Sequence, residues 1–435
     1  MVRLALWCAA SSLLAMAPGL LGAQSPELRF EGGPLVAISD GDMLASAYVN
    51  GQLGPRESAD SLMVATVSPD LRDLSLATVE VSNSVAGAPT AVAVTPDGRY
   101  AVVSESFGPR GPEGETFRDL PIGALLTLVD ISDSAAPSVV ERRDIGTRPE
   151  GLSLSPAGDL VAVAMHPADG RGIAFVPLVD GGLGEPSYAA VPGAAPEDRL
   201  SHVEWHPSGD FVAITDVNRA IIRFARVVRG ENGVSLEAWG NPVLVSKYPF
   251  MGRFTPDGRH FLTGNLYWGA DVVGIWTEAP EGDVTSIRFA AEAGEDGPRH
   301  FLVGRAETGI SPEGIAISPD GEWAVTTNLE VSYAPADDPR HTPYSSLTLI
   351  DIDPDTGRLE TVGTYAYDGI LPEAAAWDAS GSVVAVVTYD QLDPATRGGS
   401  IDFWRLVTEP APRLVKLRTS IQTPHGPHSI VLANE

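Results

Sequence analysis

The sequence predicts an all-β protein, a β-propeller of seven four-stranded blades whose ring is closed by the C-terminal strand. The first observation behind this prediction is a glycine-containing turn that recurs at intervals of 49 to 63 residues. The second is the alternation of apolar and polar residues on both sides of each turn, which is typical of β-strands. The third is an incomplete copy of the same unit, "PHGPHSIVLANE", at the C-terminus.

The recurring turn has a consistent chemistry, seen in "TPDGR" and "SPDGE". Proline fixes φ, aspartate or serine bonds to the backbone, and glycine adopts a positive φ. A period of this length is too long for helical repeats and fits a four-stranded propeller blade with long loops. Six copies of the turn mark six blades, with their glycines at Gly98, Gly158, Gly209, Gly258, Gly321 and Gly381.

Each blade is predicted to contain four strands, which we call a to d in chain order. Around Gly321, strand a is "GIAIS" and strand b is "WAVTTN". A long loop then leads to strand c, "SSLTLIDID", and a further turn leads to strand d, "LETVGTYAY". The same order is expected in the other five blades.

The first blade is predicted to be a composite of about residues 42–88 and 427–435. After a leader that runs to about Asp42, the segments "MLASAYV", "SLMVATV" and "SLATVEV" read as strands b, c and d. An alternative strand, "PLVAIS", fits the turn spacing poorly as strand a. The C-terminal "HSIVLAN" would supply strand a, and closure of the ring would remove two exposed strand edges.

The N-terminus predicts export. Residues 1–23 contain one arginine, an apolar run, Pro18 and Gly19, and then small residues, which is the order of a secretory signal peptide. An uncleaved anchor helix is the alternative. The expected mature chain, residues 24–435, would form one propeller domain in the periplasm or outside the cell. Cys8 is the only cysteine, so this domain would contain no disulfide.

The charge balance limits the partners. The chain has 57 acidic and 29 basic residues and a formal net charge of −28. Such a field disfavours nucleic acid and anionic membranes and favours cations. We therefore expect a soluble protein after cleavage, a monomer, with a small polar molecule or a protein as its partner.

At this point the sequence resembles the lactonase-type seven-bladed propellers, which include bacterial 6-phosphogluconolactonase, and the YVTN-repeat propellers. The residues that carry the resemblance are the PDG-like turns, the "TTN" at Thr326–Asn328, the pattern "FVAITDVNRAIIRFARV" and the closing "GPHSIVLANE". The resemblance implies the fold across nearly the whole mature chain and a sugar-lactone hydrolase among the activities. Family members often begin strand a with Arg-His or Pro-His, whereas here only His428 matches and glutamate takes that place in three blades.

The blade order predicts a polar site at one end of the ring. In a propeller, the start of strand a and the end of strand b lie at the same face, which we call the mouth. The predicted starts of strand a are Thr90, Glu150, Ser201, Phe250, Glu313, Glu373 and His428. The predicted ends of strand b are Tyr48, Glu105, Met165, Asp216, Asn265, Asn328 and Thr388.

Two chemical roles follow for these residues. Crowded carboxylates repel one another unless some are protonated or a cation bridges them, and a hard ion such as Ca²⁺ or Mg²⁺ suits oxygen ligands. Glu150, Glu313 and Glu373 are thus the candidate metal ligands, with a hydrated acidic funnel without a fixed ion as the alternative. The same three residues and His428 are the candidate catalytic groups, and Glu105, Asp216, Asn265 and Asn328 are the candidate ligand-binding groups.

The leading hypothesis is an exported lactonase-like propeller that binds a small polar ligand or partner at its acidic mouth. One alternative is a lactone or ester hydrolase with a mouth carboxylate or His428 as general base, assisted by a divalent cation. The other is a protein-interaction scaffold. An exposed aromatic face would favour the scaffold, whereas polar side chains that converge in a closed site would favour the enzyme; the aromatic candidates are Phe107, Tyr333, Tyr344 and Tyr389.

Overall fold

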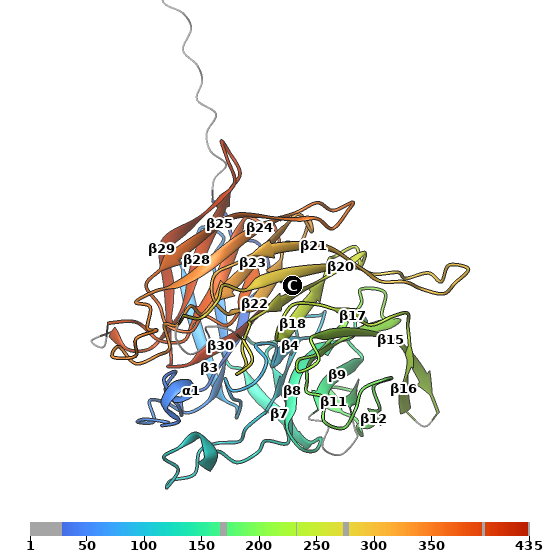
Figure 1. The fold of residues 1–435 in the computed structure, drawn as a ribbon. Coiled ribbons are helices and arrows are strands. Elements are labelled where there is room, and N and C mark those ends of the chain that lie inside the picture. The colour runs from blue at the N-terminus through green and yellow to red at the C-terminus, as the bar shows by residue number, and fades with distance from the viewer. Residues whose placement is uncertain (1–27, 166–171, 232, 273–277, 394–395, 434–435) are drawn as a thin grey trace, which may run out of the picture.

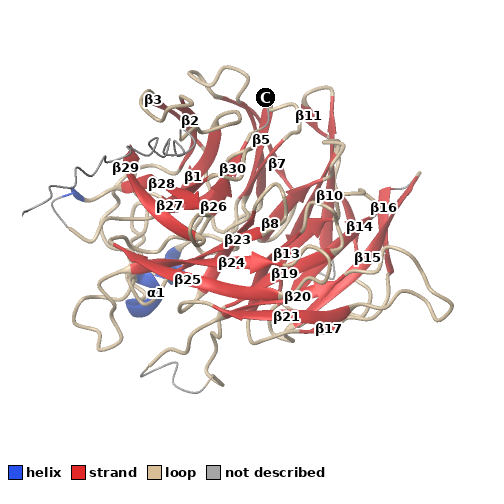
Figure 2. Ribbon diagram, turned by 90° about the horizontal axis from the view of Figure 1, so that it is seen from above, coloured by secondary structure: helices blue, strands red, loops and turns tan. Residues whose placement is uncertain are grey.

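The computed structural model describes residues 28–165, 172–231, 233–272, 278–393 and 396–433. These residues form seven antiparallel β-sheets arranged as the blades of a propeller (Figures 1 and 2). The predicted all-β, seven-bladed fold is therefore confirmed. The predicted signal peptide, residues 1–23, lies outside the described residues. In the part of the chain that is described, the structure contains no helix that is both long and apolar enough to cross a membrane.

The blades follow one another along the chain, each with strand a innermost. Blade 2 contains β4 (Val92–Val94), β5 (Tyr100–Ser104), β6 (Leu125–Asp130) and β7 (Ser138–Asp144). Blade 3 contains β8 (Pro149–Leu154), β9 (Leu160–Met165), β10 (Ile173–Val179), β11 (Gly182–Leu183) and β12 (Ser187–Ala189). Blade 4 contains β13 (Leu200–Trp205), β14 (Phe211–Asp216), β15 (Ile221–Gly230), β16 (Gly233–Ala238) and β17 (Val243–Leu244).

Blades 5 to 7 have the same antiparallel order. Blade 5 contains β18 (Pro249–Phe254), β19 (His260–Asn265), β20 (Asp283–Arg288) and β21 (Phe301–Glu307). Blade 6 contains β22 (Pro312–Ile317), β23 (Trp323–Asn328), β24 (Ser345–Ile352) and β25 (Leu359–Tyr367). Blade 7 contains β26 (Ala375–Trp377), β27 (Val383–Thr388), β28 (Gly399–Val407) and β29 (Arg413–Thr423).

The recurring turns also connect neighbouring blades. All six turn glycines have φ between 68° and 78°, the left-handed region that glycine adopts readily. A Cβ on Gly158 would lie 2.6 Å from Cδ of Pro96, the turn proline of the preceding blade. The glycine is therefore required twice, by its backbone conformation and by the close approach of the next turn around the ring.

The C-terminal strand closes the ring as predicted. Strand β30 (Pro427–Leu432) pairs antiparallel with β1 (Leu35–Ser39), with Leu432 opposite Leu35. Strands β2 (Ser61–Val67) and β3 (Leu74–Glu80) complete this sheet in the order β3-β2-β1-β30. In Figure 1 the two ends of the colour range meet in this blade, β3 in blue and β30 in red.

The assignment of strand b in this first blade was wrong. Leu35–Ser39, within the segment rejected as a weak strand a, is strand b because it pairs with β30 on one side and with β2 on the other. The segment Met43–Val49 is not a strand, and it contains most of the short helix α1 (Ala47–Asn50). Its apolar residues are buried elsewhere, in a cluster with residues of blades 6 and 7.

Candidate functional site

The starts of strand a and the ends of strand b lie together in the structure. In blade 3 Pro149 pairs with Met165, in blade 5 Pro249 pairs with Asn265, and in blade 6 Pro312 pairs with Asn328. The predicted ends of strand b are confirmed as ends or first following residues in blades 2 to 7. Tyr48 is the exception, because strand b of blade 1 ends at Ser39.

A repeated backbone turn places the residues at the start of strand a. The residue before the strand-a proline has a positive φ of 52° to 57° at Arg148, Tyr248, Ser311 and Leu371, and 89° at Gly426. A left-handed conformation is costly for a residue other than glycine and is often retained at functional sites. The residues that follow this turn and its proline are Glu150, Phe250, Glu313, Glu373 and His428.

Glu150 is neutralised by two arginines. Its side chain is fully buried, with Oε1 3.0 Å from Arg148 Nε and Oε2 4.0 Å from Arg199 Nη2. Arg199 is held by Tyr248, whose hydroxyl accepts a hydrogen bond of 2.7 Å from Nη1, and by the face of Phe250. Burial raises the pKa of Glu150, and the charges of Arg199 and Arg148 oppose this rise.

Glu313 and Glu373 lack such partners. They are 3% and 0% exposed, and among the described residues neither Oε2 of Glu313 nor either oxygen of Glu373 has a hydrogen-bond partner. Burial raises the pKa of Glu313 to about 8 against the opposing charge of Arg199. Burial and then the charges of Glu313 and Asp40 raise the pKa of Glu373 well above its usual value. At neutral pH we therefore expect this pair of carboxyl groups to retain protons.

Asp40 is a site residue that the sequence analysis missed. It directly follows β1 and so takes the place that had been assigned to Tyr48. Its Oδ2 accepts hydrogen bonds from the Val85 N–H (3.0 Å) and the Ser84 hydroxyl (3.2 Å). Burial and the nearby Asp42 raise the pKa of Asp40 to about 7. The correct assignment of β1 as strand b would have identified this residue.

His428 starts strand a of the composite blade and is held in its neutral form. It is 1% exposed, and its Nε2 lies 2.7 Å from Asn83 Oδ1, which makes Nε2 the hydrogen-bond donor. Burial lowers the pKa of His428 to about 3. This side chain can orient a neighbour by a hydrogen bond but is not protonated at neutral pH.

The four candidate ligand-binding residues at the ends of strand b are bonded within their own blades. The Asn265 amide donates to Asp283 Oδ1 (2.7 Å), and the Asn328 amide donates to Ser346 and Thr348. Asp216 accepts a hydrogen bond from Arg223 of the adjacent strand c. Glu105 accepts one from the Ala124 N–H, just before strand c of its blade. Each contact ties strand b to strand c, so the structure gives all four a structural part in the blade.

An apolar lid covers the mouth. It consists of residues 41–58, which include α1, and the loop 105–123, and the two segments are joined by the bridge between Gln52 and Thr116. Their apolar side chains pack with residues from blades 6 and 7 in one cluster that includes Met43, Leu53, Val85, Phe107, Leu120, Leu329, Leu371 and Tyr389. Of the four aromatic residues whose joint exposure would favour a scaffold, Phe107 and Tyr389 are buried here and Tyr333 packs against the same cluster. Only Tyr344 of these four is exposed, so they do not form one exposed face.

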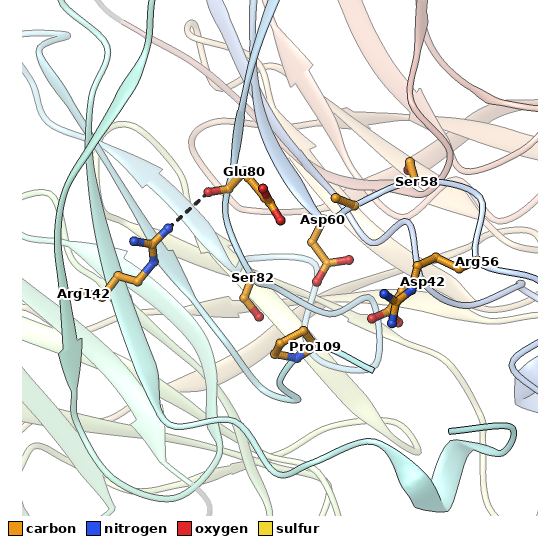
Figure 3. A pocket seen from close by; sticks show the side chains of 9 residues that line it. Asp42, Arg56, Ser58, Asp60, Glu80, Ser82, Pro109 and Arg142 are labelled. Carbon is orange, nitrogen blue, oxygen red and sulfur yellow. Dashed lines mark hydrogen bonds between the residues drawn. The ribbon is translucent and has the colours of Figure 1, made fainter. Parts of the chain in front are cut away.

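A second group of carboxylates lies at the mouth end of blade 1. Oxygens of Asp40, Asp42 and Asp60 lie within 4.8 Å of one another. Asp42 and Asp60 also line a cavity of about 410 Å³, into which Asp60 points, with Glu80 and Ser82 on one side and Asp42 and Arg56 on the other (Figure 3). Burial and the charges of Asp40 and Asp42 raise the pKa of Asp60 to about 9. Hydrogen bonds from the Gly41, Asp42, Val85 and Arg110 N–H groups hold the three side chains.

Comparison with solved structures identifies proteins of the same architecture. The chain is similar to a periplasmic gluconolactonase from Pseudomonas aeruginosa, with a TM-score of 0.60 and 17% identity over 92% of this chain and 100% of that one. It is also similar to a proposed 6-phosphogluconolactonase from Bacteroides uniformis, with a TM-score of 0.60 and 13% identity over 92% of this chain and 99% of that one. A third similar structure is a proposed 6-phosphogluconolactonase from Bacteroides fragilis, with a TM-score of 0.60 and 14% identity over 92% of this chain and 97% of that one.

Sequence comparison adds no further assignment, because no protein-family model and no curated protein matches the chain. At 17% identity or less, the structural likenesses concern the fold alone. They agree with the recurring turns, the blade order and the closing strand that carried the resemblance in the sequence. The chain therefore has the fold of the lactonase-type seven-bladed propellers.

Proposed function

We propose that this protein, after export, binds a small polar ligand at the covered mouth through Glu313 and Glu373. The observation that carries the proposal is the set of unpaired carboxylate oxygens in this pair, since both residues are buried. A buried polar group without a partner costs about 1 to 3 kcal/mol, which a ligand that donates hydrogen bonds would recover. A hydroxyl-rich molecule, an ammonium group or a hard divalent cation meets this requirement.

Glu150 has a different part in the proposed site. Because Arg148 and Arg199 already neutralise it, Glu150 is a poor third ligand for a cation. Its two arginines instead offer N–H donors beside the carboxyl pair, and such donors suit a ligand with carbonyl or hydroxyl oxygens. The site thus combines donors on the side of blades 3 and 4 with acceptors on the side of blades 6 and 7.

Hydrolysis of a lactone or ester is the second candidate function. The specific observation in its favour is the interaction between Glu313 and Glu373, which raises the pKa of Glu373 further. Two interacting carboxyl groups with unequal pKa values can supply one general acid and, where one of them loses its proton, one general base. The similar periplasmic gluconolactonase makes aldonolactones the first substrates to test on this chain.

The test of binding is calorimetric titration of the purified mature chain with calcium, magnesium and gluconolactone. We expect heat of binding with at least one of them, and its loss in Glu313→Gln and Glu373→Gln. Glu204→Gln is the control, because Glu204 is a partly buried carboxylate of β13 that pairs with Arg253 of β18. Heats that are absent with all three ligands, or equally weakened by Glu204→Gln, would contradict the proposal. Release of acid from gluconolactone by the same variants tests the hydrolase.

A further inference from the structure

The lid leaves a surface cavity on its outer side. Residues Ala47 to Gln52 on one side and Thr116, Phe117 and Arg118 on the other line a cavity of about 740 Å³. The two walls are the two lid segments, and their backbones are bonded to each other by Leu53 N–H to Glu115 O and Phe117 N–H to Gly51 O. A cavity of this size can hold a small ligand.

Tyr48 connects this cavity, through its aromatic neighbours, to the chain segment that carries Glu313. One part of Tyr48 lines the cavity, while its hydroxyl donates a hydrogen bond of 2.9 Å to Val85 O in the lid cluster. Its ring packs edge-on against Tyr333, 6.1 Å between centroids, and against Trp268 at 6.4 Å. Trp268 in turn donates a hydrogen bond of 2.7 Å to the hydroxyl of Ser311, two residues before Glu313.

The electrostatics agree with this placement. Burial, followed by the charges of Glu373 and Glu313, raises the pKa of Tyr48 well above its usual value. Burial also raises the pKa of Tyr333 to about 12, with Glu313 as a further cause. Both phenols therefore lie within electrostatic reach of the carboxyl pair and remain neutral.

We infer that Tyr48 is the gate residue that controls which molecules pass from the surface cavity to Glu313 and Glu373. A ring held by two aromatic neighbours and one hydrogen bond would obstruct this path until it moves. Rotation of the side chain into the open cavity, which it already borders, would open the path. The gate thus selects ligands by size before the carboxyl groups select them by chemistry.

This inference rests on the proposed function for the location of the ligand, but its test does not require a ligand. A water-soluble carbodiimide with glycinamide couples accessible carboxyl groups to the amine, and peptide mass spectrometry measures the rate at Glu313 and Glu373. In Tyr48→Ala and Tyr48→Leu we expect labelling of both residues to be about tenfold faster, because opening no longer requires movement of the ring.

Phe117→Ala is the matched control, since Phe117 lines the same cavity but packs on Phe107, 5.4 Å between centroids. It should leave the labelling of Glu313 and Glu373 unchanged. Asp378, a fully buried carboxylate in the turn between strands a and b of blade 7, reports general unfolding. If Tyr48→Ala unfolds the chain, Tyr48→Leu keeps apolar packing at this position. Equal labelling in wild type and the Tyr48 variants, or equal acceleration by Phe117→Ala, would overturn the gate. Faster labelling without any ligand heat would instead contradict only the proposed function.

Discussion

Glu150 in blade 3 and Glu313 in blade 6 occupy the same place in their blades, yet their surroundings differ. Both follow the proline of a "PEG" sequence at the start of strand a, and both are buried. Glu150 forms ion pairs with two guanidinium groups, although neither of its oxygens has a hydrogen-bond partner among the described residues. Glu313 instead lies near a second carboxyl group, Glu373, and among the same residues its Oε2 has neither an ion-pair nor a hydrogen-bond partner. The repeat therefore determines where each side chain lies but not its charge state.

The residues that create the difference come from outside the repeated motif. In blade 3 the residue before the proline is Arg148, while in blades 6 and 7 the same place holds Ser311 and Leu371. The next blade adds Arg199 on the side of Glu150, whereas no ion pair involves Glu373 in the part of the chain that the structure describes. We conclude that one half of the mouth is a compensated ion cluster and the other half is a site that needs a proton or a ligand.

The largest effect should come from removal of the shared cation. Arg199→Met leaves Glu150 with one partner and withdraws the charge that lowers the pKa of Glu313. Because breaking a buried ion pair costs several kcal/mol and Arg199 is partly exposed, we expect a loss of about 2 kcal/mol in the free energy of unfolding, measured with urea. The control is Arg229→Met, whose pair with Asp159 is about half exposed and should contribute less than about 1 kcal/mol. Equal losses in the two variants would contradict the contrast.

Two isosteric changes should separate the two halves by magnitude. At pH 8 we expect Glu150→Gln to stabilise the protein less than Glu373→Gln does, because removal of the Glu150 charge relieves its burial cost but also leaves two guanidinium groups without their counter-charge. Glu373→Gln should be neutral or stabilising at the same pH, since it removes a group that folding forces to hold a proton. Melting curves of the two variants and the wild type in one buffer provide the measurement. Similar destabilisation by both changes would show that Glu373 is a structural hydrogen-bond acceptor.

The pH dependence of stability should reveal the same pair. The pKa of Glu313 rises from an unfolded value of 4.5 to about 8 in the folded protein. The folded state thus binds more protons than the unfolded state between these values, and the contribution of Glu313 to stability is lost as pH rises through this window. The slope per proton is about 1.4 kcal/mol per pH unit. In Glu313→Gln the decline of stability between pH 5 and 8 should become shallower, and an unchanged slope would exclude a raised pKa.

Much of the fold followed from local sequence, because each blade repeats its turn chemistry. The strand-b ends Asp216, Asn265 and Asn328 were located to the residue by counting from the turn glycines. The strand assignment in blade 1 was wrong because this blade lacks the turn. Its paired strands β1 and β30 are about four hundred residues apart in the sequence. The segment Met43–Val49 was misleading because it is as apolar as a strand would be. Apolar content indicates burial but does not indicate the surface against which a segment is buried.

The sequence predicted where the candidate residues lie in their blades, but it did not predict that they would be buried. Counting placed Glu150, Glu313, Glu373 and His428 at one mouth, yet nothing in the sequence indicated that a lid from blades 1 and 2 would cover them. Burial of the lid cluster depends on contacts between distant residues, such as the hydrogen bond from the Tyr389 hydroxyl to Met43 O, which are 346 positions apart. The three glutamates beneath the lid are therefore at most 3% exposed, which differs from the hydrated acidic funnel that was considered as the alternative.

The smallest effect is expected at His428, which takes the place of the glutamates in the composite blade. Its folded pKa of about 3 lies below the unfolded value of 6.5, so the folded state binds fewer protons between these values. Stability contributed by His428 is therefore lost as pH falls through this window, opposite in direction to the contribution of Glu313. His202, His206, His260, His300 and His425 also have lowered pKa values, which makes His428 one of several contributors.

His428→Asn should lower the free energy of unfolding by about 1 kcal/mol at pH 7, because the hydrogen bond to Asn83 is lost. Below pH 6.5 it should also make the pH dependence of that free energy shallower, by at most the slope that corresponds to one bound proton. The direct measurement is the NMR signal of the His428 ring between pH 5 and 8, which should not shift. A titration midpoint near 6.5 would show that the ring is solvated. A hydrolase that depends on this ring as general base would then become possible, whereas a ring that stays neutral and bonded to Asn83 leaves proton transfer at the mouth to Glu313 and Glu373.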